Sequence, residues 1–234
     1  MKKRISLVLL FAILCGVMTL SAQKPFAGRI QFVTSVEGTD DPNVQAQMAG
    51  ISTEKIVMGN CMKEVVNQNG VGAISISNGD YNVVYEILDI SAYNMGKYYR
   101  ETKGEDLQKQ LASHKYDYEY TQETKTIAGY NCTKVIATIT DMESDEESTV
   151  VYWVTNDLNV GANINFSDAP GLKGFPLATE QQIEGEGMSF TLIMTASEVK
   201  ADKKIKAAEF YRPSDAISFD EMSPETKAQL GIPD

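Results

Sequence analysis

Apolar and polar residues alternate along most of this chain, and the alternation predicts β-strands separated by short turns. In the segment 28–36, Ile30, Phe32 and Thr34 share one face, while the residues between them share the other. Asn69-Gly70 is a strong signal for a tight hairpin turn. The strands expected on this basis are 28–36, 54–58, 62–66, 71–77, 81–88, 97–100, 115–122, 125–127, 132–140, 148–155, 177–184, 188–200 and 207–211.

Helical spacing is rare. Leu107 and Leu111 lie four residues apart within 105–113, and acidic residues fill the first turn of that segment, as the helix dipole favours. The segments 43–49 and 224–230 are shorter helix candidates. Many strands follow one another with few helices, and no alternating strand–helix–strand order occurs. The sequence therefore predicts a mainly β, antiparallel fold, which excludes a parallel nucleotide-binding sheet.

The N-terminal segment has a different pattern. Lys2, Lys3 and Arg4 precede the apolar run 5–17, and small or polar residues follow it. This is the three-part pattern of a secretory signal peptide, which we place at residues 1–22. The apolar run is about thirteen residues long, whereas a helix that spans a bilayer needs about twenty. No later run reaches that length, so we expect no transmembrane span in the mature chain.

Cleavage is expected after Ser21 or Ala22. We assign residues 23–234 to one exported domain, located in the periplasm or outer envelope, or secreted. The alternative is lipid attachment at Cys15. A lipid-attachment site has a small residue before the cysteine, and Leu14 stands there instead. The sequence therefore favours a chain released without a lipid anchor.

Charge excludes one class of partner. The removed segment carries three basic residues and no acidic one, so cleavage changes the net charge from −11 to −14. Such an acidic protein is repelled by nucleic acids and by anionic membrane surfaces. The only basic cluster, Lys200 to Lys206, resembles a hairpin tip, so we expect no nucleic-acid partner.

Two cysteines, Cys61 and Cys132, remain after cleavage. In an oxidising compartment an even number of cysteines permits one disulfide. The alternative is two separate buried thiols, and the sequence does not decide between them because it does not give the Cα separation.

Catalytic motifs are missing from the sequence. The single histidine, His114, ends the expected helix without a partner motif, so a helix-terminal or surface role is favoured. The acidic run 141–147 lacks the glycine of a calcium loop and indicates a solvated hairpin loop. We therefore expect a non-enzymatic protein with no cofactor and no metal. A hydrolase that uses dispersed carboxylates is the catalytic alternative.

Three tyrosines, Tyr116, Tyr118 and Tyr120, form the most pointed pattern. Their spacing of two residues places them on one face of a strand. One interpretation is an aromatic face that packs on the core. The other is the wall of a cleft that binds a sugar, a glycan or an acyl chain.

Four short motifs occur in an order that is similar to that of a known family. They are the Ile-x-Gly-Tyr-x-Cys-x-Lys turn at 127–134, the Trp-x-Thr-x-x-Leu strand end within 152–158, the Gly-x-Pro-Leu approach within 172–177 and Phe-x-x-Pro at 210–213. Over about residues 26–220 the chain resembles the exported Bacteroidetes-type domain-of-unknown-function family numbered 4412. It also resembles a related family named for a Gly-Leu-Pro-Gly-Leu-Ile motif.

The resemblance implies a curved antiparallel sheet, a half-barrel like that of the periplasmic lipoprotein carriers, with one or two short helices. It transfers no catalytic residue. The expected function is binding of a lipid, another amphipathic ligand or an envelope protein on the concave face. The alternative is a structural or adhesive interaction protein of the envelope. The expected ligand-binding residues are Tyr85, Tyr116, Tyr118, Tyr120, Trp153 and Phe190.

Overall fold

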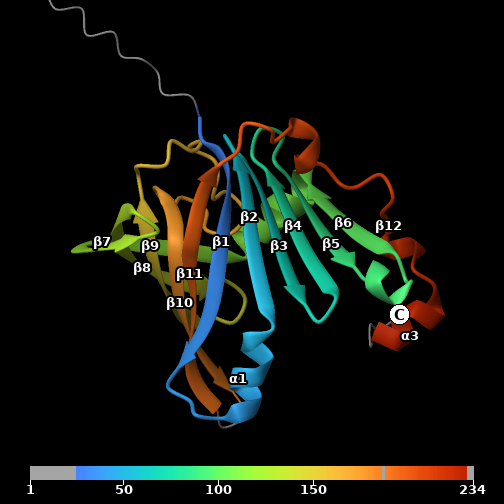
Figure 1. Ribbon diagram of the computed structural model, residues 1–234, viewed down its shortest axis with the longest axis horizontal. Helices are drawn as coiled ribbons and strands as arrows, with labels where there is room; N and C mark the ends of the chain where they lie inside the picture. The colour runs from blue at the N-terminus through green and yellow to red at the C-terminus, as the bar shows by residue number, and fades with distance from the viewer. Residues whose placement is uncertain (1–24, 186–187, 231–234) are drawn as a thin grey trace, which may run out of the picture.

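A single large sheet dominates the computed structural model, which describes residues 25–185 and 188–230. Twelve strands lie in the order β12-β6-β5-β4-β3-β2-β1-β11-β10-β9-β8-β7 (Figure 1). The expected signal peptide lies outside the described residues. The strands are β1 (Ala27–Glu37), β2 (Ile51–Met58), β3 (Cys61–Gln68), β4 (Val71–Asn78), β5 (Val83–Asp89), β6 (Lys97–Lys103), β7 (His114–Ile127), β8 (Tyr130–Asp141), β9 (Glu147–Thr155), β10 (Phe175–Gly185), β11 (Met188–Ala201) and β12 (Ile217–Ser218).

Neighbouring strands are antiparallel throughout, except for the short pair β12 and β6, which is parallel. The sheet is curved but not closed into a barrel, since β7 and β12 are its two edges. Figure 1 shows the strands from β10 to β7 turning away behind β1 and β11. The β1–β11 pairing shifts register between Gln31 and Phe32, and the β9–β10 pairing shifts between Pro176 and Ala178. Bulges of this kind increase the bending of a sheet. The open, mainly antiparallel sheet confirms the predicted mainly β, half-barrel fold.

Turn chemistry fixes the register of the strands that matter most below. Asn69 and Gly70 join β3 to β4, and both have positive φ angles, 51° and 83°. A two-residue turn of that kind suits the twist of a hairpin. It pairs Gln68 with Val71, and the pairing then continues without a shift to Cys61 and Asn78.

Three short α-helices accompany the sheet: α1 (Pro42–Ala49), α2 (Gly104–Ala112) and α3 (Pro224–Leu230). All three lie where helices were expected. The strand expected at 207–211 is wrong, because residues Ala207–Phe210 form a 3-10 helix, η2. The side chain of Phe210 is fully buried in a cluster with Ile76 and Tyr85. Residues 207–210 thus pack Phe210 against the sheet instead of pairing as a strand.

The register assigns every side chain to one of two faces. We call inner the face that carries Ile30, Lys55 and Ser77, and outer the face that carries Ile56 and Ile76. The 3-10 helix η2 packs against the outer face of β3 and β4. A long connection between β9 and β10, residues 156–174, lies against the inner face and is called here the bridging loop.

Candidate functional site

The bridging loop fills one part of the inner face. Its Phe166 packs with Val84 of β5 and Leu107 of α2. Further along the loop, Ala169 and Leu172 join a second buried cluster. The residues of β8 and β9 in that cluster are Val135, Ala137, Val150, Tyr152 and Val154. We call this part of the inner face, under the bridging loop, the filled region.

Polar contacts hold the bridging loop in place. The hydroxyls of Ser77 and Ser167 lie 2.6 Å apart, and Asn163 donates through Nδ2 to the carbonyl of Gly79 at 3.1 Å. Within the loop, the buried amide of Asn165 donates to the carbonyls of Leu172 and Gly174 at 3.1 and 2.8 Å. Since buried backbone acceptors need partners, these bonds fix the path of the loop.

The three regularly spaced tyrosines lie on the inner face and brace this loop. Tyr118 donates to the carbonyl of Pro170 at 3.3 Å, and the backbone N–H of Lys173 donates to the hydroxyl of Tyr120 at 2.7 Å. Tyr116 stacks on Tyr118, with ring centroids 6.3 Å apart. Burial raises the pKa of Tyr116 and of Tyr118. Of the three, Tyr118 packs against the buried cluster of the filled region, whereas Tyr120 is exposed.

The other expected ligand-binding residues do not join them. Trp153 lies on the outer face, where its indole N–H donates to Glu180 at 2.7 Å and the ammonium of Lys125 lies 3.9 Å from the ring centroid. Tyr85 is buried on the outer face in the cluster with Phe210. Phe190 pairs with Ile183 near the end of the β10–β11 hairpin. The structure therefore distributes the six residues over several places.

Cys61 and Cys132 are free, buried thiols in the structure, where no disulfide joins them. Cys61 and Cys132 are buried in two different clusters, and the thiol of Cys61 lies 3.4 Å from Oδ1 of Asn78. Burial, and then the nearby carboxylate of Asp80, raise the pKa of Cys61 to about 11. Burial also raises the pKa of Cys132. Thiols with raised pKa values are poor nucleophiles at neutral pH.

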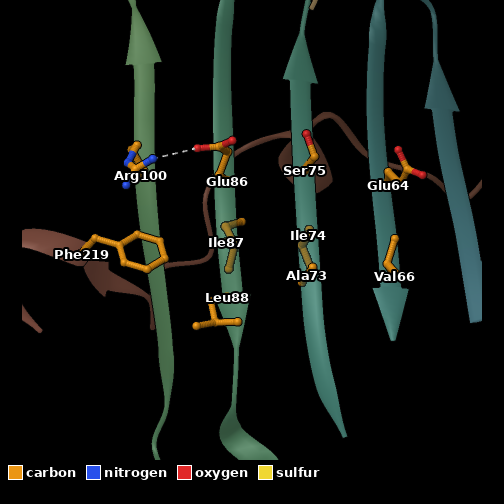
Figure 2. A pocket seen from close by; sticks show the side chains of 10 residues that line it. All are labelled: Glu64, Val66, Ala73, Ile74, Ser75, Glu86, Ile87, Leu88, Arg100 and Phe219. Carbon is orange, nitrogen blue, oxygen red and sulfur yellow. Dashed lines mark ion pairs between the residues drawn. The ribbon is translucent and has the colours of Figure 1, made fainter. Parts of the chain in front are cut away.

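An open groove occupies the remaining part of the inner face, over β3 to β6. It has a volume of about 440 Å³ (Figure 2). This part, which the bridging loop leaves uncovered, is called here the groove. The residues that line it are Glu64, Val66, Ala73, Ile74, Ser75, Glu86, Ile87, Leu88, Arg100 and Phe219.

Strand register arranges the groove in two parallel rows. The apolar row runs across β3, β4 and β5 through Val66, Ala73 and Leu88. Val66 pairs with Ala73, and Ala73 pairs with Leu88. Phe219 borders this row, with its ring centroid 6.3 Å from that of Tyr98 on β6. An apolar strip bordered by an aromatic ring is suited to an aliphatic chain.

The polar row lies two residues further along each strand. Register places Lys55, Glu64, Ser75, Glu86 and Arg100 side by side on β2 to β6. Two ion pairs of equal length occur within it. Lys55 Nζ lies 3.5 Å from Glu64 Oε2. Arg100 Nη1 lies 3.5 Å from Glu86 Oε2, and Figure 2 shows this second pair. The guanidinium of Arg100 also lies over the ring of Phe219, 5.6 Å from its centroid.

A smaller hollow of about 280 Å³ lies on the other side of Glu64. Its lining includes Tyr152 and Asp168 of the filled region and Met194 of β11. Glu64 belongs to the lining of both hollows.

His114 and the acidic run 141–147 lie at the surface. The imidazole Nε2 of His114 lies 3.6 Å from a carboxylate oxygen of Asp141, and both side chains are partly exposed. Asp141 accepts backbone N–H bonds from Glu143 and Ser144, which lower the pKa of its carboxyl. Among residues 25–185 and 188–230, no three His, Cys, Asp or Glu side chains come close enough together to hold a metal ion. No helix in the same residues is long and apolar enough to cross a membrane.

The groove was not predicted from the sequence. Its apolar members, Val66, Ala73 and Leu88, are ordinary strand residues with no motif. A signal was nevertheless present in the register, because the turn at Asn69-Gly70 pairs Val66 with Ala73 and Glu64 with Ser75. What the sequence lacks is any sign of which face the bridging loop covers.

No family model matches the chain, and no curated protein matches it. Among solved structures, the crystal structure of a DUF1329 family protein from Desulfovibrio piger ATCC 29098 is similar, with a TM-score of 0.35 and 13% sequence identity. The alignment covers 81% of this chain and 91% of that chain. The similarity to the families named above therefore rests on the short motifs alone.

Proposed function

We propose that this protein is a non-enzymatic, exported binding protein that holds an amphipathic molecule with one apolar chain in the groove. The single observation that carries the proposal is the apolar row of Val66, Ala73 and Leu88, left uncovered on the inner face and bordered by Phe219. Such an apolar strip next to polar groups suits a ligand with the same division.

Size and exposure support the same occupant. A volume of about 440 Å³ lies within the range of small-molecule sites, which is about 300–1,000 Å³. Ala73 is exposed at the centre of the groove, between partly buried Val66 and Leu88. Covering this strip would remove apolar surface from water, at about 25 cal/mol per Å². The signal-peptide pattern of the sequence supports a role in the envelope.

A variant that fills the groove tests the proposal. Ala73→Trp places a large ring on the apolar row, at a position where the native side chain is exposed. Ala208→Trp is the matched control, because Ala208 is exposed in η2, on the outer face. Native mass spectrometry after incubation with envelope lipid extract measures the bound mass.

We expect wild type and Ala208→Trp to carry a bound amphiphile, and Ala73→Trp to carry at most about a tenth as much. Circular dichroism of both variants verifies the fold. An unliganded wild type would contradict the proposal, and so would equal binding by folded Ala73→Trp.

A further inference from the structure

If the groove binds an amphiphile as proposed, its polar row indicates which head group the ligand has. We propose that the ligand has a primary-amine head, which lies over Ser75 between Glu64 and Glu86. The apolar chain would then lie on the neighbouring row of Val66, Ala73 and Leu88.

The number of acceptors at this place suits an ammonium. Register places Ser75 directly between Glu64 on β3 and Glu86 on β5. In the structure Glu64 turns toward Lys55 and Glu86 toward Arg100. Because neighbouring strands are about 4.8 Å apart, a change of side-chain rotamer would bring both carboxylates to a group held above the serine. An ammonium has three N–H donors and no acceptor. Two carboxylates and one hydroxyl provide three acceptors for those donors.

These acceptors have capacity left for a ligand. Each carboxylate forms its ion pair through Oε2, at 3.5 Å from Lys55 or Arg100, and its Oε1 has no ion pair within the described part of the chain. The hydroxyl of Ser75 has no hydrogen bond to any side chain or backbone group in residues 25–185 and 188–230. Glu64 and Glu86 side chains are 21% and 53% exposed, so a ligand can reach both.

Local charge does not decide the head group, because Lys55 and Arg100 balance Glu64 and Glu86 within the polar row. The preference for an amine rests on the acceptors at Glu64, Ser75 and Glu86. Of the two cations, only Arg100 lines the groove, since Lys55 is 8% exposed and its ammonium lies 5.4 Å from the centroid of the Phe32 ring. The net charge of the whole chain, −11, adds a long-range attraction for cations.

Three ligands with the same chain and different heads test this inference. Affinities of n-decylamine, n-decanol and n-decanoate are measured by calorimetry at pH 7 and low salt, below micelle formation. We expect the amine to bind about tenfold more tightly than the alcohol, since charge-assisted hydrogen bonds are stronger than neutral ones. Added salt should reduce the difference.

Single substitutions test which residues cause the preference for the amine. Glu86→Gln and Glu64→Gln should each reduce the preference for the amine to about twofold or less, with little change for decanol. Glu198→Gln is the control, because Glu198 is exposed on the outer face of β11 and the substitution changes the net charge equally. It should leave the preference unchanged.

The outcomes separate this inference from the proposed function. Equal binding of the three ligands, or tightest binding of decanoate through Arg100, would overturn the amine head and leave a binding groove. A preference for the amine that survives both glutamine variants would overturn it as well. Failure of all three ligands to bind would overturn the proposed function and the inference with it.

Discussion

The filled region and the groove share one face of one sheet, yet they differ in what covers them. In the filled region, the inward residues of β8 and β9 are apolar and the bridging loop packs on them. In the groove, rows of apolar and charged residues alternate, and the side chains of Ala73 and Glu86 are exposed. The comparison teaches that a uniformly apolar surface is covered by the protein's own loop, whereas a surface of mixed apolar and charged rows stays uncovered.

Matched phenylalanines give the largest expected contrast in stability. Phe166→Ala removes a buried ring from the filled region and should lower the free energy of unfolding by about 3–5 kcal/mol. Phe219→Ala removes a partly buried ring at the border of the groove, and should cost about 1–2 kcal/mol while weakening ligand binding. Urea unfolding measures both. Equal losses would break the distinction between the two regions.

Alkaline pH should destabilise the filled region. Burial raises the pKa of Tyr152 to about 12, whereas an unfolded tyrosine has a pKa of about 10. Because the folded pKa is raised, the stabilisation is fully present below pH about 10 and is lost as the pH rises through about 12. It amounts to about 2–3 kcal/mol. Tyr152→Phe should make this decline shallower in urea titrations at increasing pH, and an unchanged decline would contradict the burial of this phenol.

Two substitutions of polar residues, one in each region, extend the comparison. Asn165→Ala removes the two hydrogen bonds to the carbonyls of Leu172 and Gly174 and leaves both acceptors in a buried place. The expected loss is about 1–3 kcal/mol by urea unfolding. Ser75→Ala in the open groove should change stability by less than about 0.5 kcal/mol. A large loss for Ser75→Ala would show that the groove is packed.

Much of the sheet could be predicted from the sequence because its determinants are local. Alternation and turn signals such as Asn69-Gly70 define strands, and strands with such turns define register. Short segments beyond the main strands were harder. Residues 207–210 have strand-like neighbours, but burial of Phe210 makes them a 3-10 helix. The two-residue strand β12 carries no detectable pattern.

The site could be predicted only in part, since it depends on contacts between distant residues. The common face of Tyr116, Tyr118 and Tyr120 followed from their spacing, but their contact with the bridging loop did not. Trp153 and Tyr85 lie on the outer face because of register across several strands. Which part of the inner face stays open depends on the path of residues 156–174, and the hydrogen bonds of Asn163 and Asn165 that fix this path are non-local or specific to the folded loop.

The most direct test of the account locates a bound chain in the molecule. A crystal of the protein with ω-bromodecylamine would reveal the bromine by its anomalous scattering. The account predicts a peak in the groove, over the row of Val66, Ala73 and Leu88, with the amine at Ser75. A bromine peak within the filled region, next to Tyr152 or Leu172, or no bound ligand at saturating concentration, would contradict it.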